Sequence, residues 1–175
     1  MRLLAISGSL RAASINSALL RAVGRLAPAQ VDVRLCALVG ALPIFNPDLD
    51  CEGALPPPVA RLRDEIAAAD ALLIASPEYA HGVSGAIKNT LDWLVSFEGF
   101  VDKPVAVLNS SPRAHHADDA LRETLLTMSA RIIGPASIPI SLLGSGIKTE
   151  EQILASADAT AAIGQVFVAL REALA

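Results

Sequence analysis

Residues 3–20 read LLAISGSLRAASINSALL and contain three different patterns in succession. The first four residues are apolar without interruption, which is typical of a strand buried on both faces of a sheet. Residues 7–14 are mostly small or polar, and from Ile15 onward apolar residues such as Leu19 recur at helical spacing. The stretch therefore predicts a strand, a polar loop and a helix, which is the repeating unit of an α/β fold.

The same alternation continues along the chain. Val31, Val33 and Leu35 alternate with charged residues as a second strand, further apolar runs lie at residues 71–75, 105–108 and 132–140, and helical patterns separate the strands. Five strand–helix units in alternation predict a parallel sheet with helices on both faces. Five strands fit the flavodoxin-like order 2-1-3-4-5 better than a six-stranded Rossmann sheet. We therefore expect residues 1–175 to form a single flavodoxin-like α/β domain, a three-layer sandwich.

Local signals mark several element ends. The three prolines at residues 56–58 favour a helix start, because proline fits the first helical turn. Residues 87–95 carry the third helical pattern, and the prolines within residues 132–140 predict an irregular fifth strand. Thr149 and Gln152 have the spacing of a capping box and predict the start of the last helix.

Composition excludes several classes of protein. A chain with 53% hydrophobic and 18% charged residues is not largely disordered. The net charge is −4 and the positive charges are spread along the chain, so no basic stripe indicates nucleic-acid binding. We expect neither a signal peptide nor a membrane span. Two cysteines, Cys36 and Cys51, are too few for a disulfide framework and predict reduced thiols in a cytoplasmic protein.

The most distinctive polar segments follow the first four predicted strands. In an open parallel sheet, ligands bind beyond the carboxyl ends of the strands, where the strand order reverses. We therefore expect the functional site to be built from four loops, at residues 7–14, 43–50, 76–82 and 109–116.

The first loop and the helix start after it are rich in hydrogen-bond donors, namely Ser9, Arg11, Ser14, Asn16 and Ser17. Free backbone N–H groups and the helix dipole attract an anion there, and hydroxyls with an arginine suit a phosphate monoester. Neither a Walker A motif nor GxGxxG is present, so a dinucleotide pyrophosphate is not indicated at this loop. The alternative is an ordinary serine cap on the helix.

The third loop contains Pro77-Glu78-Tyr79 followed by His81-Gly82. Proline ends the strand, and the turn then exposes backbone N–H groups beside an aromatic side chain. Such a surface suits the edge of a flat heterocycle that carries carbonyls and ring nitrogens. The alternative is a plain turn without a ligand.

Three other pairs of residues suggest a function, but each pair has a simpler explanation. Lys88 and Asp92 are four residues apart and are placed to pair on a helix surface. His115 and His116 suggest a metal, but no Cys or carboxylate set with ligand spacing accompanies them, so we expect a solvated loop or substrate mouth and no metal site. Ser110–Ser111 lack the GxSxG elbow of a serine hydrolase.

Together these segments resemble the NAD(P)H-dependent FMN reductase family, which includes quinone and chromate reductases of flavodoxin-like fold. The loop from Leu42 to Leu49 is also similar to the second-strand loop of that family, and the resemblance extends from Leu3 to about Val107. It rests on three motifs, Gly8-Ser9-Leu10-Arg11-x-x-Ser14-x-Asn16, Pro77-Glu78-Tyr79 and Gly85-x-x-Lys88-Asn89-x-x-Asp92-Trp93.

The resemblance implies bound FMN, with NADPH or NADH as electron donor and a quinone, free flavin or similar small molecule as acceptor. It implies that the first loop surrounds the FMN phosphate, that residues 77–82 border the isoalloxazine ring, and that the fourth loop approaches the ring from another side. A homodimer or homotetramer is also implied. The implied cofactor-binding residues are Ser9, Arg11, Ser14, Asn16, Ser17, Pro77, Glu78, Tyr79, Ala80, His81, Gly82, Ser110 and Ser111.

The chain departs from the family pattern at two places. Ala80 stands where the family usually has Asn, which removes a side-chain donor near the ring. The fourth loop, residues 109–116, lacks the glycines that are frequent in the family, which changes the shape of the substrate opening.

The expected chemistry is hydride transfer from a nicotinamide to the flavin and then to the acceptor, in a ping-pong sequence. Backbone N–H groups of the His81–Gly82 turn are candidates to stabilise negative charge on the reduced flavin, and we expect Glu78 to act mainly through its backbone. We expect no side chain to be an obligatory acid or base. Two alternatives remain open: a flavodoxin-type electron carrier, which is usually more acidic than −4, and a phosphate-binding regulatory domain without flavin.

Overall fold

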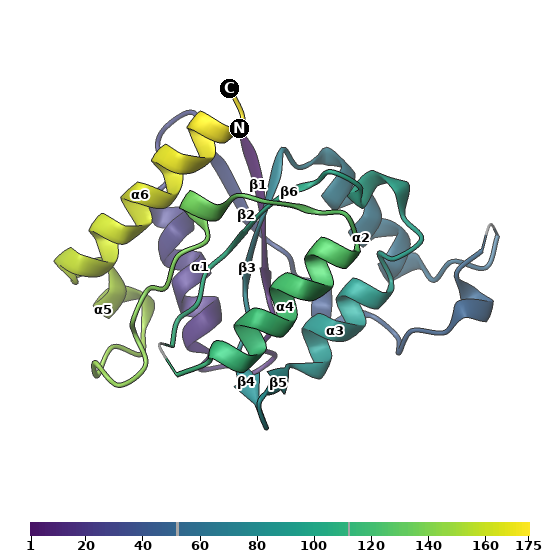
Figure 1. Ribbon diagram of the computed structural model, residues 1–175, viewed down its shortest axis with the longest axis horizontal. Helices are drawn as coiled ribbons and strands as arrows, with labels where there is room; N and C mark the ends of the chain where they lie inside the picture. Colours follow the sequence, from purple (N-terminus) through teal and green to yellow (C-terminus); the bar gives the residue numbers. More distant parts are fainter. Residues whose placement is uncertain (52, 112) are drawn as a thin grey trace.

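The architecture is a parallel five-stranded sheet in the order β2-β1-β3-β6-β7 (Figure 1). The computed structural model describes residues 1–51, 53–111 and 113–175, so Pro112 of the fourth loop lies outside the described residues. This order is the predicted 2-1-3-4-5, and the flavodoxin-like fold is confirmed. The strands of the sheet are β1 (Arg2–Ser7), β2 (Asp32–Leu35), β3 (Ala71–Ala75), β6 (Pro104–Val107) and β7 (Arg131–Ile132).

Helices cover both faces of the sheet (Figure 1). One face packs against α1 (Ile15–Arg25), α5 (Glu150–Leu154) and α6 (Ala157–Ala173), and the other against α2 (Pro57–Ala68), α3 (Gly85–Asp92) and α4 (His115–Thr127).

The strand sequences explain the two layers. In β1, Leu3 and Ala5 belong to the core on the α1 and α6 side, whereas Leu4 and Ile6 belong to the core on the α2, α3 and α4 side. All four are buried, because a strand covered on both faces needs apolar residues at successive positions. The edge strand β2 is mostly exposed and carries Asp32 and Arg34, charges that are common on protected sheet edges.

Helix starts agree with their local sequence. Ser14, Ser84 and Ser156 are the N-caps of α1, α3 and α6, and each side chain accepts a backbone N–H of the first turn. Pro56 is the N-cap of α2 and proline follows it in the first turn, which confirms the predicted helix start.

Three predicted boundaries are wrong in detail. The helix expected over residues 87–95 ends at Asp92, and Val95 is 67% exposed beyond it. The fifth strand is irregular as predicted, but it starts one residue earlier and its regular part, β7, is only two residues long. The chain then turns into the 3-10 helix η4 (Gly134–Ala136), because Pro135 cannot donate to a ladder, and Pro139 makes one isolated parallel bridge to Asn109. The capping box at Thr149 is present, but it opens the short α5 rather than the last helix, which starts anew at the Ser156 cap.

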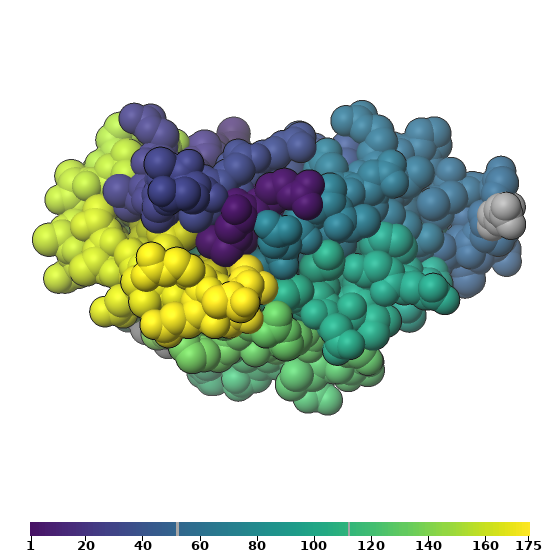
Figure 2. All heavy atoms as spheres, turned by 90° about the horizontal axis from the view of Figure 1, so that it is seen from above, coloured from purple at the N-terminus to yellow at the C-terminus, as the bar shows by residue number. Residues whose placement is uncertain are grey.

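Both chain termini lie near each other at the amino end of β1 (Figure 1 and Figure 2). The Met1 ammonium donates to the Gln30 carbonyl at 2.9 Å, and the Arg131 guanidinium donates to the Ala173 carbonyl at 3.3 Å. Among the helices of the described residues, none combines the length and the apolar character needed to cross a membrane. The loops at the carboxyl ends of β1, β3 and β6 lie at the opposite end of the sheet (Figure 1).

Candidate functional site

The backbone of the first loop is closely packed against neighbouring segments where it leaves β1. The N–H of Gly8 donates to the Ala75 carbonyl at 2.8 Å, and the hydroxyl of Ser84 donates to the Gly8 carbonyl at 2.5 Å. A Cβ at Gly8 would lie 2.7 Å from the Ser76 Cβ and closer still to its Oγ. Glycine is therefore required where the first loop passes the end of β3.

The start of α1 keeps free donors. Ser14 is the N-cap, and its Oγ accepts the Ser17 N–H at 3.2 Å, so the serine-cap alternative is correct for this residue. Its own hydroxyl proton remains available, because a hydroxyl both accepts and donates. Among the hydrogen bonds of the described residues, none uses the backbone N–H of Ile15 or Asn16. This helix end can therefore still bind an anion.

The other predicted donors of this loop differ in exposure. Ser9 is half-buried, and its hydroxyl accepts the Arg11 N–H at 3.4 Å. Arg11 is exposed, and its guanidinium forms no ion pair within the described residues. The Ser17 hydroxyl lies 2.8 Å from that of Ser7, a residue that sequence reasoning did not single out. Hydroxyls, an unpaired guanidinium and a free helix terminus in one loop form a donor set that fits a phosphate monoester.

Asn16 joins the first loop to the fourth. It is 3% exposed, and its Oδ1 accepts the Ser110 hydroxyl at 2.7 Å. The Ser110 carbonyl in turn accepts the N–H groups of Leu142 and Leu143 at 3.1 and 3.0 Å. The structure therefore brings Asn16 and Ser110 together, as predicted for one site, and their side chains hold loops against each other.

The third loop forms a β-hairpin with a two-residue turn, which the sequence did not predict. β4 (Glu78–Tyr79) pairs antiparallel with β5 (Gly82–Val83), with Ala80 and His81 between them. Both turn residues have positive φ, 50° and 59°, as a type I′ turn requires. The six residues predicted to border a ring thus share one small element at the end of β3.

Two side-chain contacts join this hairpin to α4. The Glu78 carboxylate accepts the Ala117 N–H at 2.9 Å, at the start of α4, a contact that the sequence did not predict. His115 and His116, predicted to lie in a solvated loop or substrate mouth, have exposed side chains but belong to the first turn of α4 rather than to a loop. The His116 ring stacks on that of His81, with centroids 4.4 Å apart.

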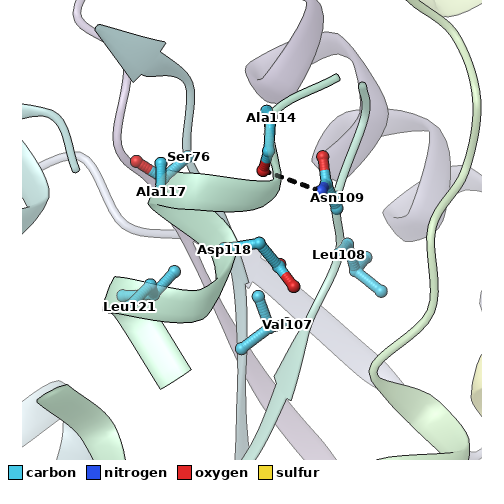
Figure 3. A pocket seen from close by; sticks show the side chains of 8 residues that line it. All are labelled: Ser76, Val107, Leu108, Asn109, Ala114, Ala117, Asp118 and Leu121. Atoms are coloured by element: carbon cyan, nitrogen blue, oxygen red, sulfur yellow. Dashed lines mark hydrogen bonds between the residues drawn. The ribbon is translucent and has the colours of Figure 1, made fainter. Parts of the chain in front are cut away.

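The fourth loop is held by its own asparagine (Figure 3). Asn109 donates from Nδ2 to the Ala114 carbonyl at 3.2 Å, and its Oδ1 accepts the Ser111 N–H at 2.9 Å. Asp118 lies nearby on α4, and a cavity of about 10 Å³ remains between Asn109, the end of β3 and the first turns of α4. That space is about the size of one water molecule, so it cannot hold a cofactor.

The motif from Gly85 to Trp93, which forms α3 and its C-cap, holds the second loop in place. Asn89 accepts the Phe45 N–H at 2.8 Å and donates to the Pro43 carbonyl at 3.0 Å, and the Trp93 indole N–H donates to the same carbonyl at 2.8 Å. The motif thus supports the loop structure through Asn89 and Trp93. Lys88 and Asp92 form the predicted surface pair.

Burial raises the pKa of the Cys36 thiol, and the negative charge of Glu65 adds to this effect. The thiol therefore stays protonated and is a poor nucleophile. Cys36 and Cys51 are both free. Across the described residues, no group of three or more His, Cys, Asp or Glu side chains is arranged to hold a metal ion.

Comparisons with known proteins agree with this geometry. Residues 1–142 match the family model of NADPH-dependent FMN reductases. The chain is 35% identical over 159 residues to an NAD(P)H-dependent FMN reductase of Pseudomonas aeruginosa, covering 88% of this chain and 85% of that protein. It is 33% identical over 169 residues to a quinone reductase of Pseudomonas putida, covering 93% and 88%.

Among solved structures, the flavoenzyme FerB, an NAD(P)H:(acceptor) oxidoreductase from Paracoccus denitrificans, superposes with a TM-score of 0.73. The two chains are 28% identical, and the match covers 97% of this chain and 95% of that one. Sheet order, first-loop motif and family match lead to one assignment, and this chain belongs to the NADPH-dependent FMN reductase family.

Proposed function

We propose that the protein is an FMN-dependent reductase that takes hydride from NADPH or NADH and passes it to a quinone, free flavin or similar small acceptor. The observation that carries this proposal is the donor set of the first loop, located at the reversal of strand order in a chain of this family. When bound, FMN supplies the redox chemistry, and the protein orients it.

The first-loop residues divide into two roles in this proposal. Ser9, Arg11 and the free N–H groups at the start of α1 bind the phosphate directly, because they are the accessible donors. Ser14 and Asn16 are buried and Ser17 is half-buried, and their internal hydrogen bonds shape the loop. The Ser14 hydroxyl proton stays free to donate to the phosphate as well.

The ring is assigned to the β4–β5 hairpin and the fourth loop. In this proposal the backbone N–H groups of the Ala80–His81 turn donate to the ring edge, because Gly82 is already paired with Tyr79 in the hairpin. Tyr79, 60% exposed, forms one border of the opening. Ser111 borders the ring site from the side of β6. Donor and acceptor use the same opening in turn, which predicts ping-pong kinetics.

The relatives support the choice of acceptor. The Pseudomonas putida relative is named a quinone reductase, whereas the name of FerB, NAD(P)H:(acceptor) oxidoreductase, does not specify the acceptor. An exposed aromatic rim suits a flat, electron-poor molecule such as a quinone. Rapid loss of flavin absorbance when NADPH is added to the purified protein without oxygen would support the reductase. Reduction only through a partner reductase would indicate an electron carrier.

Arg11 provides the sharpest test of the phosphate assignment. Replacing Arg11 with Ala should raise the FMN dissociation constant about 10- to 100-fold, because a hydrogen bond to a charged group contributes about 1.5–3 kcal/mol. Arg25→Ala is the matched control, since Arg25 lies at the other end of α1 and pairs with Glu150 at 3.5 Å. Equal FMN affinity in Arg11→Ala and wild type would refute the assignment.

A further inference from the structure

The turn of the β4–β5 hairpin is in a conformation that its own residues disfavour. Ala80 and His81 have φ angles of 50° and 59°, and such turns prefer Asn-Gly, because a Cβ is strained in the left-handed region. Strained backbone persists where surrounding structure holds it, and it concentrates at functional sites. The contacts that hold this turn therefore matter for whatever the turn binds.

One such contact is a helix cap supplied from a distant part of the chain. The N-cap position of α4 is Ala114, which has no side-chain acceptor, although helix starts usually carry Ser, Thr, Asp or Asn there. The N–H of Ala117, third in the helix, donates instead to the Glu78 carboxylate at 2.9 Å. Glu78 lies 39 residues earlier and is the first residue of the hairpin.

Both the charge and the shape of the Glu78 side chain suit a position at the start of α4. A helix N-terminus carries partial positive charge, and a carboxylate near it is stabilising. The contact therefore has two components, an accepted hydrogen bond and a favourable charge, and an isosteric amide would keep the first while losing the second.

A second contact lies at the turn itself. The His81 ring stacks on the His116 ring, with centroids 4.4 Å apart and planes inclined by 27°. His116 is also in ring contact with His115, at 4.0 Å. The hairpin is thus fastened to the first turn of α4 at the start of β4 and again at the turn.

We propose that Glu78 is a positioning residue for the flavin: by capping α4 it holds the strained Ala80–His81 turn in the conformation that presents its backbone N–H groups to the ring. The His81–His116 stack is the second fastening of the same turn. This inference rests on the proposed function, because it assigns the ring to this hairpin. It gives the Glu78 side chain a role that is separate from contact with the ring.

The experiment compares Glu78→Ala with Glu78→Gln. The Ala variant loses the cap, and we expect it to bind FMN about tenfold more weakly, to change the visible spectrum of the bound flavin and to speed amide exchange at Ala117 in the protein without FMN. The Gln variant keeps an acceptor oxygen and should restore the spectrum and most of the affinity. Glu150→Ala is the matched control, because it removes a first-turn carboxylate of α5 and should leave flavin binding unchanged.

A second variant keeps the test decisive if Glu78→Ala does not fold. His116→Ala removes the stack from an exposed position, and it should weaken FMN binding about threefold and alter the flavin spectrum in the same direction. Wild-type affinity and spectrum in both Glu78→Ala and His116→Ala would overturn the inference while leaving the proposed function intact. If the wild-type protein itself bound no FMN, the proposed function would fail, and the Ala117 exchange would still report on the cap.

Discussion

Gly8 shows how one residue determines the path of the first loop. The loop leaves β1 beside the end of β3, and it passes so close to Ser76 that a Cβ has no room. Gly85, at the start of α3, is different, because a Cβ there would meet nothing within 4 Å. The two glycines therefore make a matched pair of substitutions.

Gly8→Ala should lower the free energy of unfolding by about 1–3 kcal/mol, because the new methyl group forces Ser76 or the loop to move. Gly85→Ala should raise it by up to about 1 kcal/mol, since alanine loses less backbone entropy in a helix. Urea denaturation of both variants measures the difference. Equal stability of Gly8→Ala and wild type would show that the loop is not tightly packed at this point.

The β4–β5 hairpin explains why the departure of Ala80 from the family pattern affects stability. The position requires positive φ, which Asn adopts more readily than Ala. Ala80→Asn should therefore raise the free energy of unfolding by about 0.5–1 kcal/mol in urea denaturation. Ala54→Asn, at an exposed site without positive φ, is the control and should give no gain. A loss of stability in Ala80→Asn would mean that the turn is not strained.

Elements with a long periodic pattern could be predicted from the sequence. Residues 71–75 are β3 as expected, because five successive apolar residues have one explanation in an α/β chain. The β4–β5 hairpin was missed, because two-residue strands show no periodicity and its turn lacks the Asn-Gly signal. The donors of the first loop were found because a polar loop before a helix is a local signal.

Contacts between loops could not be predicted in the same way. Asn16 and Ser110 are 94 residues apart, and Glu78 and Ala117 are 39 apart, so no local pattern links either pair. Each pair meets only because the parallel sheet places the carboxyl ends of β1, β3 and β6 side by side. Sequence reasoning therefore located the loops but not the bonds between them.

One surface hollow lies away from the loops of the candidate site. It has a volume of about 410 Å³ and is formed where α3 and the end of α4 lie side by side. Val95 and Val101 line it and are 67% and 55% exposed, and both Lys88 and Glu123 lie at the same hollow. A contact between copies with two-fold symmetry uses the same patch on both, and exposed valines beside charged residues suit such a patch.

We therefore predict that two copies of the chain associate through this hollow. Val95→Lys places a charge in the predicted contact and should shift the homodimer or homotetramer expected of the wild type toward smaller species, as measured by size-exclusion chromatography with light scattering. Val168→Lys is the control, because this valine is 46% exposed on α6, on the opposite face of the sheet. A monomeric wild type, or dissociation by Val168→Lys alone, would place the association elsewhere or exclude it. Because the hollow is separate from the β4–β5 hairpin, Val95→Lys should leave FMN affinity unchanged even where it breaks the dimer.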